Sequence, residues 1–147
     1  MEAVLFTGAP AAGKSTFYRE RFFATHVRVS LDLLKTRNRE RRLLDFCFET
    51  SQRFVVDNTN PTHESRAAYL SSAAEVGFRV IGYYFESKVG DCLKRNADRI
   101  GRVPDVAILS TAKRLEIPDK SEGFDELWYV RMVEPGFQVE EWRDEVR

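Results

Sequence analysis

Residues 8–16 read Gly8-Ala9-Pro10-Ala11-Ala12-Gly13-Lys14-Ser15-Thr16 and match the pattern G-x-x-x-x-G-K-S. The stretch follows a short apolar run, residues 3–7, and precedes residues 17–23, which suit a helix. A strand, a glycine-bearing loop and a helix in this order are typical of a phosphate-binding loop, whose backbone N–H groups and helix dipole face an anion. Lys14 would reach the β- and γ-phosphates, and the Ser15 hydroxyl would bind Mg²⁺. The stretch therefore predicts a nucleoside triphosphate site; the alternative is a chance glycine-rich turn.

Length and composition predict one domain over residues 1–147. Lys plus Arg and Asp plus Glu both number 23, so the overall charge neither favours nor excludes a nucleic-acid partner. The two cysteines lack CxxC spacing, which argues against a disulfide framework or a zinc site. A strand begins within three residues of the N-terminus, and no apolar run is long enough to cross a membrane. We therefore expect a cytoplasmic protein with no signal peptide and no membrane partner.

Apolar runs and helical spacing alternate along the chain. The runs predict strands at residues 3–7, 27–30, 53–57, 78–85 and 127–133, with residues 137–142 open as a further edge strand. Helices are expected at residues 13–24, 33–51, 61–76, 87–97 and 105–115. Asn38 marks a break or bend in the second of these helices, and Asn60-Pro61 forms the start signal of the third. The pattern predicts an α/β fold with a five-stranded, mostly parallel sheet and right-handed crossovers.

Two acids follow predicted strands at the sheet edge that carries the glycine-bearing loop. Asp57 ends an apolar strand, as an acid near a magnesium ion does, although it could also cap the next helix. Asp32 could accept the proton of an attacking hydroxyl, or could only complement a helix dipole. Because ligands of parallel sheets collect at the carboxyl ends of the strands, this convergence favours a phosphoryl-transfer site.

Basic residues gather in two further places. Arg99 and Arg102 lie three apart beside Gly101, so they could share a face and move onto the triphosphate as part of a lid, with Arg95 contributing. A basic run, residues 35–42, could meet nucleic-acid phosphates. Both features also fit an ordinary solvated helix face.

The loop, Ser30-Leu31-Asp32, and Val55-Val56-Asp57-Asn58-Thr59-Asn60-Pro61-Thr62 together resemble the kinase domain of polynucleotide 5′-kinases, as in the bacteriophage end-healing enzyme and the animal polynucleotide kinase/phosphatase. Further matches are Ser65-Arg66, Asn96-x-x-Arg99-x-x-Arg102 and Glu122-Gly123-Phe124. The resemblance runs from about Leu5 to about Arg131. It implies the three-layer P-loop NTPase kinase fold with a helical lid.

The resemblance also implies roles for individual residues. Residues 8–16, with Arg99 and Arg102, would bind ATP, and Ser15 and Asp57 would hold Mg²⁺. Lys14, Asp32 and Arg99 would be catalytic, with Asp32 as the general base for a 5′-hydroxyl. The acceptor side is expected to include Asp32, Lys35, Thr59, Asn60 and Arg66.

The sequence departs from the family at two points. Lys35 stands where the bacteriophage enzyme has an arginine that grips the acceptor's 3′ phosphate, and a lysine cannot make that bidentate contact. There is also no D-x-D-x-T or D-x-D-x-V segment, so a kinase without a phosphatase half is expected.

Three hypotheses about function remain open at this point. The first is a kinase that uses ATP and Mg²⁺ to phosphorylate 5′-hydroxyl ends of DNA or RNA. The second is a kinase of the same fold that acts on a small hydroxyl compound such as a nucleoside, a sugar or an antibiotic. The third is a nucleotide-binding accessory ATPase, against which the presence of both Asp32 and the lid arginines argues.

Overall fold

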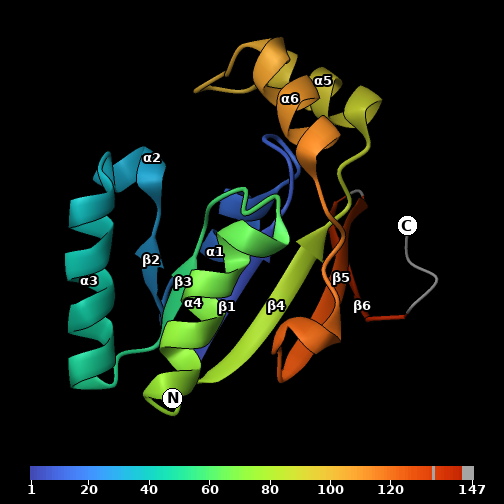
Figure 1. Cartoon of the computed structure of the whole chain (residues 1–147). Helices are drawn as coiled ribbons and strands as arrows, with labels where there is room; N and C mark the ends of the chain where they lie inside the picture. The colour runs from blue at the N-terminus through green and yellow to red at the C-terminus, as the bar shows by residue number, and fades with distance from the viewer. Residues whose placement is uncertain (134, 144–147) are drawn as a thin grey trace.

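In the described part of the chain, six strands form one sheet in the order β2-β3-β1-β4-β5-β6 (Figure 1). The computed structural model describes residues 1–133 and 135–143. The strands are β1 (Glu2–Thr7), β2 (Val27–Val29), β3 (Phe54–Val56), β4 (Arg79–Phe85), β5 (Glu126–Val133) and β6 (Gly136–Glu141). Strands β1 to β5 run parallel, and β6 pairs antiparallel with β5. The expected domain also includes positions 134 and 144–147, which lie outside the described residues, and its extent stays a prediction.

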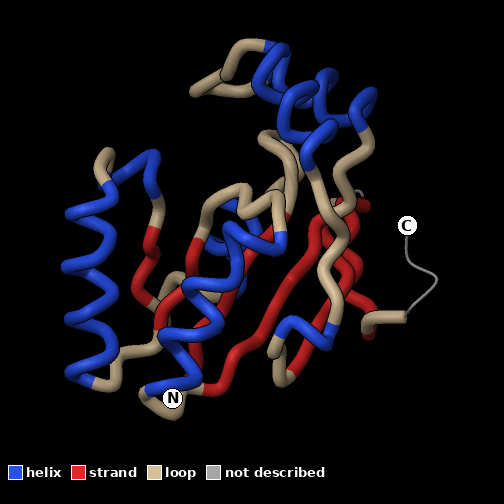
Figure 2. Tube along the Cα trace, viewed as in Figure 1, coloured by secondary structure: helices blue, strands red, loops and turns tan. Residues whose placement is uncertain are grey.

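Helices occupy the connections between the parallel strands. They are α1 (Lys14–Arg21), α2 (Leu31–Leu34), α3 (Arg37–Thr50), α4 (His63–Glu75), α5 (Val89–Asp98), α6 (Asp105–Arg114) and the short 3-10 helix η1 (Lys120–Glu122). Helix α1 covers one face of the sheet, and α3 and α4 cover the other (Figure 2). Helices α5 and α6 stand above the carboxyl ends of the strands (Figure 1). The α/β class, its three layers and the helical lid are therefore as the sequence predicts.

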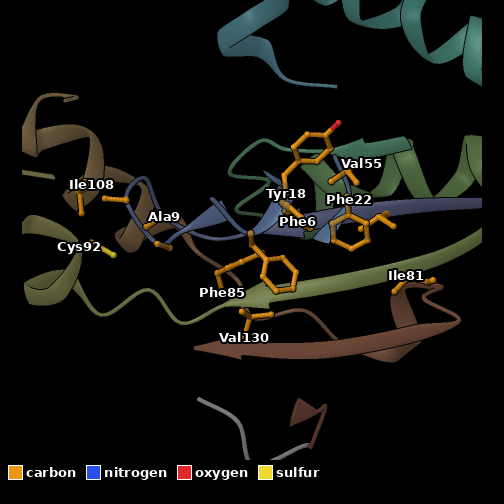
Figure 3. Packing of buried hydrophobic residues seen from close by; sticks show 14 residues of the cluster. Phe6, Ala9, Tyr18, Phe22, Val55, Ile81, Phe85, Cys92, Ile108 and Val130 are labelled. Atoms are coloured by element: carbon orange, nitrogen blue, oxygen red, sulfur yellow. The ribbon is translucent and has the colours of Figure 1, made fainter. Parts of the chain in front are cut away.

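The central strand β1 is apolar on both faces because helices cover both of them. On the α1 face, the ring of Phe6 packs against that of Phe85, at a centroid distance of 4.9 Å (Figure 3). It also packs against the ring of Phe17 in α1, at 5.9 Å. The same cluster includes Cys92 of α5 and Ile108 of α6, which lie near the loop after β1 (Figure 3). The core thus ties the lid helices to that loop.

The sheet has one strand more than the five predicted. Strand β6 lies at an edge, where Phe137 and Val139 pack against the core while Gln138 is exposed. Such a half-buried edge strand carries less apolar signal than a central one. Among the described residues, no helix combines the length and the apolar composition needed to cross a bilayer.

One predicted helix break and one predicted helix start lie a few residues from their positions in the structure. The helix expected over residues 33–51 is split at Lys35–Thr36, before Asn38, because Lys35 has a φ of 73° and the Thr36 hydroxyl caps α3 by accepting from the Arg39 N–H. Helix α4 starts after Thr62, which forms a capping box with Ser65. The Asn60-Pro61 pair precedes this start and does not cap the helix.

Candidate active site

The loop after β1 adopts the backbone conformation that a phosphate-binding loop needs. Ala11 and Gly13 have φ values of 65° and 100°, in the left-handed region, so the chain curls between the strand and α1. The first turn of α1 has no side-chain cap and no acidic residue, so its N–H groups are left for an external anion. At Gly8 a Cβ atom would lie 2.9 Å from Cβ of Phe85, which explains the first glycine of the motif.

Lys14 is a buried cation within this loop. Its Nζ atom donates to the carbonyl oxygens of Gly8 and Ala9 at 2.9 and 2.8 Å. Burial lowers the pKa of Lys14 from 10.5 to about 8, a shift that the carboxylates of Asp57 and Asp32 only partly oppose. The local surroundings therefore supply less negative charge than the ammonium group requires. A triphosphate would supply it.

The hydroxyl of Ser15 and the carboxylate of Asp57 lie together at the carboxyl end of β3. Ser15 Oγ donates to Asp57 Oδ2 at 3.0 Å, and the Asp57 side chain is only 2% exposed. A hydroxyl beside a carboxylate is a donor set that suits Mg²⁺ bound together with phosphate oxygens. The residues present thus fit the metal that the sequence predicts. Asp57 lies beside the Ser15 hydroxyl, and Thr62, not Asp57, caps the following helix.

Asp32 lies on α2, and the preceding residue, Leu31, is fixed by the segment after β3. The Leu31 N–H donates to Asn58 Oδ1 at 2.9 Å. Asn58 Nδ2 donates to the buried carboxylate of Glu40 at 3.1 Å, and Tyr69 donates its hydroxyl to the same oxygen at 3.0 Å. Burial, reinforced by Glu40, raises the pKa of Tyr69 to about 12, so its hydroxyl remains a donor. A buried hydrogen-bond network therefore sets the position of α2.

Helix α5 and the segment that follows it, which belong to the lid, lie beside the phosphate-binding loop. Arg95 Nη1 donates to the Ala11 carbonyl at 2.8 Å and so joins α5 to the loop. The buried side chain of Asn96 donates to the Val103 carbonyl at 2.7 Å and accepts from the Val103 N–H at 3.0 Å. These two bonds close the turn that follows α5, residues 99–102, and Arg99 of this turn is among the residues that line the cavity. The Arg99 side chain is exposed, and its guanidinium makes a long hydrogen bond, 3.4 Å, to the Gly101 carbonyl.

One cavity of about 630 Å³ joins these groups. Its lining comes from the loop, α2, the segment after β3, the lid and β5: Pro10, Ala11, Gly13, Lys14, Ser15, Thr16, Leu31, Asp32, Asp57, Asn58, Thr59, Arg95, Asp98, Arg99, Val103 and Met132. The structure therefore brings together Lys14, Asp32 and Arg99. Of the expected loop residues, Gly8, Ala9 and Ala12 are buried and do not line the cavity.

Outside the loop, four more of the predicted site residues do not line this cavity. Lys35 is exposed at the end of α2. Arg102 is also exposed and lies 3.8 Å from Asp105. It does not share a helix face with Arg99, because α5 ends at Asp98. Asn60 is buried and donates to the Phe6 carbonyl at 2.8 Å, which ties the segment after β3 to β1. Arg66 is the fourth.

Arg66 is completely buried, with 0% of its side chain exposed. Its guanidinium donates to both carboxylate oxygens of Glu122, at 3.0 and 3.2 Å, and to the carbonyls of Asn60 and Glu116. These hydrogen bonds occupy the N–H groups with which Arg66 was expected to bind the acceptor substrate. Arg66 thus holds the segment after β3 to η1, and in this structure it does not face the cavity.

Several residues in or beside the cavity lining carry no role in the sequence analysis. Asn58 belongs to the segment after β3 but acts through its contacts with Leu31 and Glu40. Arg28 donates to Asp57 Oδ2 at 2.8 Å and to Ser15 Oγ at 3.1 Å. A charged residue inside the apolar run Val27-Arg28-Val29 is a signal that could have found it. Nothing in the local sequence marks Met132.

Comparison with known proteins places the fold among the P-loop kinases. A gluconokinase from Sinorhizobium meliloti 1021 superposes with a TM-score of 0.64 at 16% identity, over 91% of this chain and 84% of that one. Kti12 of Chaetomium thermophilum, solved with ADP-AlF3, gives a TM-score of 0.60 at 14% identity, over 88% of each chain. The chain thus has a P-loop kinase-like α/β fold.

By sequence, the chain is similar to the bifunctional polynucleotide phosphatase/kinase of Schizosaccharomyces pombe, with 29% identity over 129 residues. The match covers 84% of this chain and 32% of that protein, so the chain spans about a third of the length of this relative. No protein-family model matches the chain.

Proposed function

We propose that this chain is an ATP- and Mg²⁺-dependent kinase that phosphorylates the 5′-hydroxyl end of DNA or RNA. The single observation that carries the proposal is the cavity that Lys14, Asp32 and Arg99 line together. A protein that only binds nucleotide needs neither an acid opposite the phosphate loop nor a lid arginine. The similarity to the Schizosaccharomyces pombe polynucleotide phosphatase/kinase supports a nucleic-acid acceptor.

In the proposed reaction the acceptor oxygen bonds to the γ-phosphorus of ATP, the bond from that phosphorus to the bridging oxygen breaks, and the hydroxyl proton goes to Asp32. When bound, Mg²⁺ neutralises charge on the β- and γ-phosphates. Lys14 and Arg99 stabilise the charge on the transferring group. Ser15 and Asp57 would hold the metal, and the lid loop would exclude water from the cavity.

The test is a transfer assay with labelled ATP and three groups of acceptors: DNA and RNA oligonucleotides with 5′-hydroxyl ends, and a panel of nucleosides and sugars. The wild type is compared with Asp32→Asn and with a control, Asp45→Asn, which removes an acid from α3, away from the cavity. We expect label on the oligonucleotides, a loss of about 10²- to 10⁴-fold in Asp32→Asn, and no change in the control. ATP binding by Asp32→Asn should persist, as equilibrium dialysis would measure.

Each other outcome contradicts a defined part of the proposal. Label on small molecules alone would favour a small-molecule kinase, for which the gluconokinase likeness offers only a shared fold. Label on no acceptor would favour an accessory ATPase. Full activity of Asp32→Asn would remove Asp32 from the role of general base.

A further inference from the structure

Arg28 lies in the edge strand β2 between two valines. Side chains of a strand alternate between its faces, and Val27 and Val29 both pack on the face that α3 and α4 cover. Arg28 therefore points to the opposite face, where α1 and Ser15 lie. Its side chain is 28% exposed, since β2 is at the edge of the sheet.

The guanidinium of Arg28 bridges the two groups that fit Mg²⁺. Nε donates to Asp57 Oδ2 at 2.8 Å, and Nη2 donates to Ser15 Oγ at 3.1 Å. Ser15 Oγ also donates to Asp57 Oδ2 at 3.0 Å. The three side chains thus form a closed triangle in which one carboxylate oxygen accepts two hydrogen bonds.

A metal ion and this guanidinium compete for the same atoms. If Mg²⁺ bound a lone pair of Ser15 Oγ while Arg28 kept the other, the two cations would be roughly 4 Å apart. Repulsion at that distance is strong beside a carboxylate that is itself nearly inaccessible to solvent. Arg28 can leave the site, because its partly exposed side chain can turn from the sheet edge into solvent.

We propose that the Arg28 guanidinium occupies the metal site when no metal is bound, so that Arg28 and a divalent metal exclude one another. In the nucleotide-free protein, Arg28 neutralises Asp57 and keeps free metal out. Metal enters with the nucleotide, because the phosphates add the negative charge that outweighs Arg28. The inference rests on the proposed function only in assigning Ser15 and Asp57 to the metal.

The test is a titration of the nucleotide-free full chain with Mn²⁺, with free Mn²⁺ measured by electron paramagnetic resonance. The variants are Arg28→Gln and a matched control, Arg53→Gln, which removes an exposed arginine at the other end of β3. We expect Arg28→Gln to bind Mn²⁺ about tenfold more tightly than the wild type, and Arg53→Gln to be unchanged. Arg28→Lys keeps the charge without the fork of donors and should fall between them.

A double variant locates the effect. Adding Asp57→Asn to Arg28→Gln should return Mn²⁺ affinity to the wild-type value or below. Equal Mn²⁺ affinity in Arg28→Gln and the wild type would overturn the proposal and leave Arg28 as a structural partner of Asp57. A gain that survives Asp57→Asn would overturn it too, because the added metal would then lie elsewhere.

No acceptor takes part in this titration. Failure of the kinase assay would therefore not change the interpretation of the Mn²⁺ titration. Failure of the Mn²⁺ titration would likewise leave the proposed kinase activity untouched.

Discussion

Replacing Lys14 by methionine should change how the stability of the protein depends on pH. Lys14 is buried and its pKa falls from 10.5 to about 8, mainly because burial disfavours the charged form. Between these two values the unfolded chain binds more protons than the folded chain at this site. The free energy of unfolding of the wild type therefore rises with pH in this window, and the full cost of the buried charge is present below pH 8.

The size of the effect follows from the shift. Holding the charged ammonium in the fold costs on the order of 3 kcal/mol near neutral pH. Lys14→Met removes this cost but leaves the Gly8 and Ala9 carbonyls without their donor, which costs about 1–3 kcal/mol. The two contributions nearly offset each other at neutral pH. At higher pH only the second remains, so the wild type should gain about 2 kcal/mol relative to Lys14→Met between about pH 6.5 and about pH 9.5.

Urea denaturation of both proteins across this range, followed by circular dichroism, measures the difference. Using the same two proteins cancels the contributions of the other groups that titrate there. Stability curves that stay parallel to within about 0.5 kcal/mol would refute the argument that Lys14 is a desolvated cation. Lys14→Met should also lose nucleotide binding, because it removes the charge that would face the phosphates.

Three further predictions concern the surroundings of the site. Glu40→Leu should lower kcat about tenfold while ATP affinity, measured with a fluorescent nucleotide, stays unchanged, because Asn58 loses its acceptor and no longer fixes α2. A drop in ATP affinity instead would show that the network supports the loop. Arg66→Met should destabilise the fold by about 3–5 kcal/mol in urea at neutral pH, since Glu122, whose side chain is only 11% exposed, loses the guanidinium that binds both of its carboxylate oxygens. Burial opposes ionisation of Glu122, but the hydrogen bonds from Arg66 and its neighbours outweigh it and hold the pKa of Glu122 below 4.5. The contribution of Glu122 to stability is thus present above pH 4.5 and lost as pH falls through the lowered value, so the stability difference between the wild type and Arg66→Met should shrink as the pH falls. If the exposed arginines of α3 meet nucleic-acid phosphates, replacing Arg39, Arg41 and Arg42 by glutamine should flatten the salt dependence of oligonucleotide phosphorylation, by about one unit of log–log slope for each phosphate that is no longer neutralised; an unchanged slope would remove this helix from the interface.

The sequence by itself determined the architecture of the sheet edge that carries the candidate site. The spacing of Gly8, Gly13 and Lys14 predicts the phosphate loop, because only that order of strand, loop and helix aims N–H groups at an anion. Apolar runs ending in acids place Asp32 and Asp57 at the same edge, since the carboxyl ends of parallel strands meet there. These inferences need only local periodicity and the handedness of the crossovers.

Only the tertiary structure decided which charged side chains reach the cavity and which are held in hydrogen bonds within the fold. Arg66 follows a motif of the acceptor side, yet Glu122, 56 residues later, takes its guanidinium. From the sequence, Arg28 is only a residue of a short strand; in the structure, the packing of β2 beside α1 places it against Asp57 and Ser15. Arg99 and Arg102 do not share a helix face because α5 ends at Asp98. For Arg66 and Arg28 the deciding partner is distant in sequence, and no local pattern records a contact that forms only when strands and helices pack.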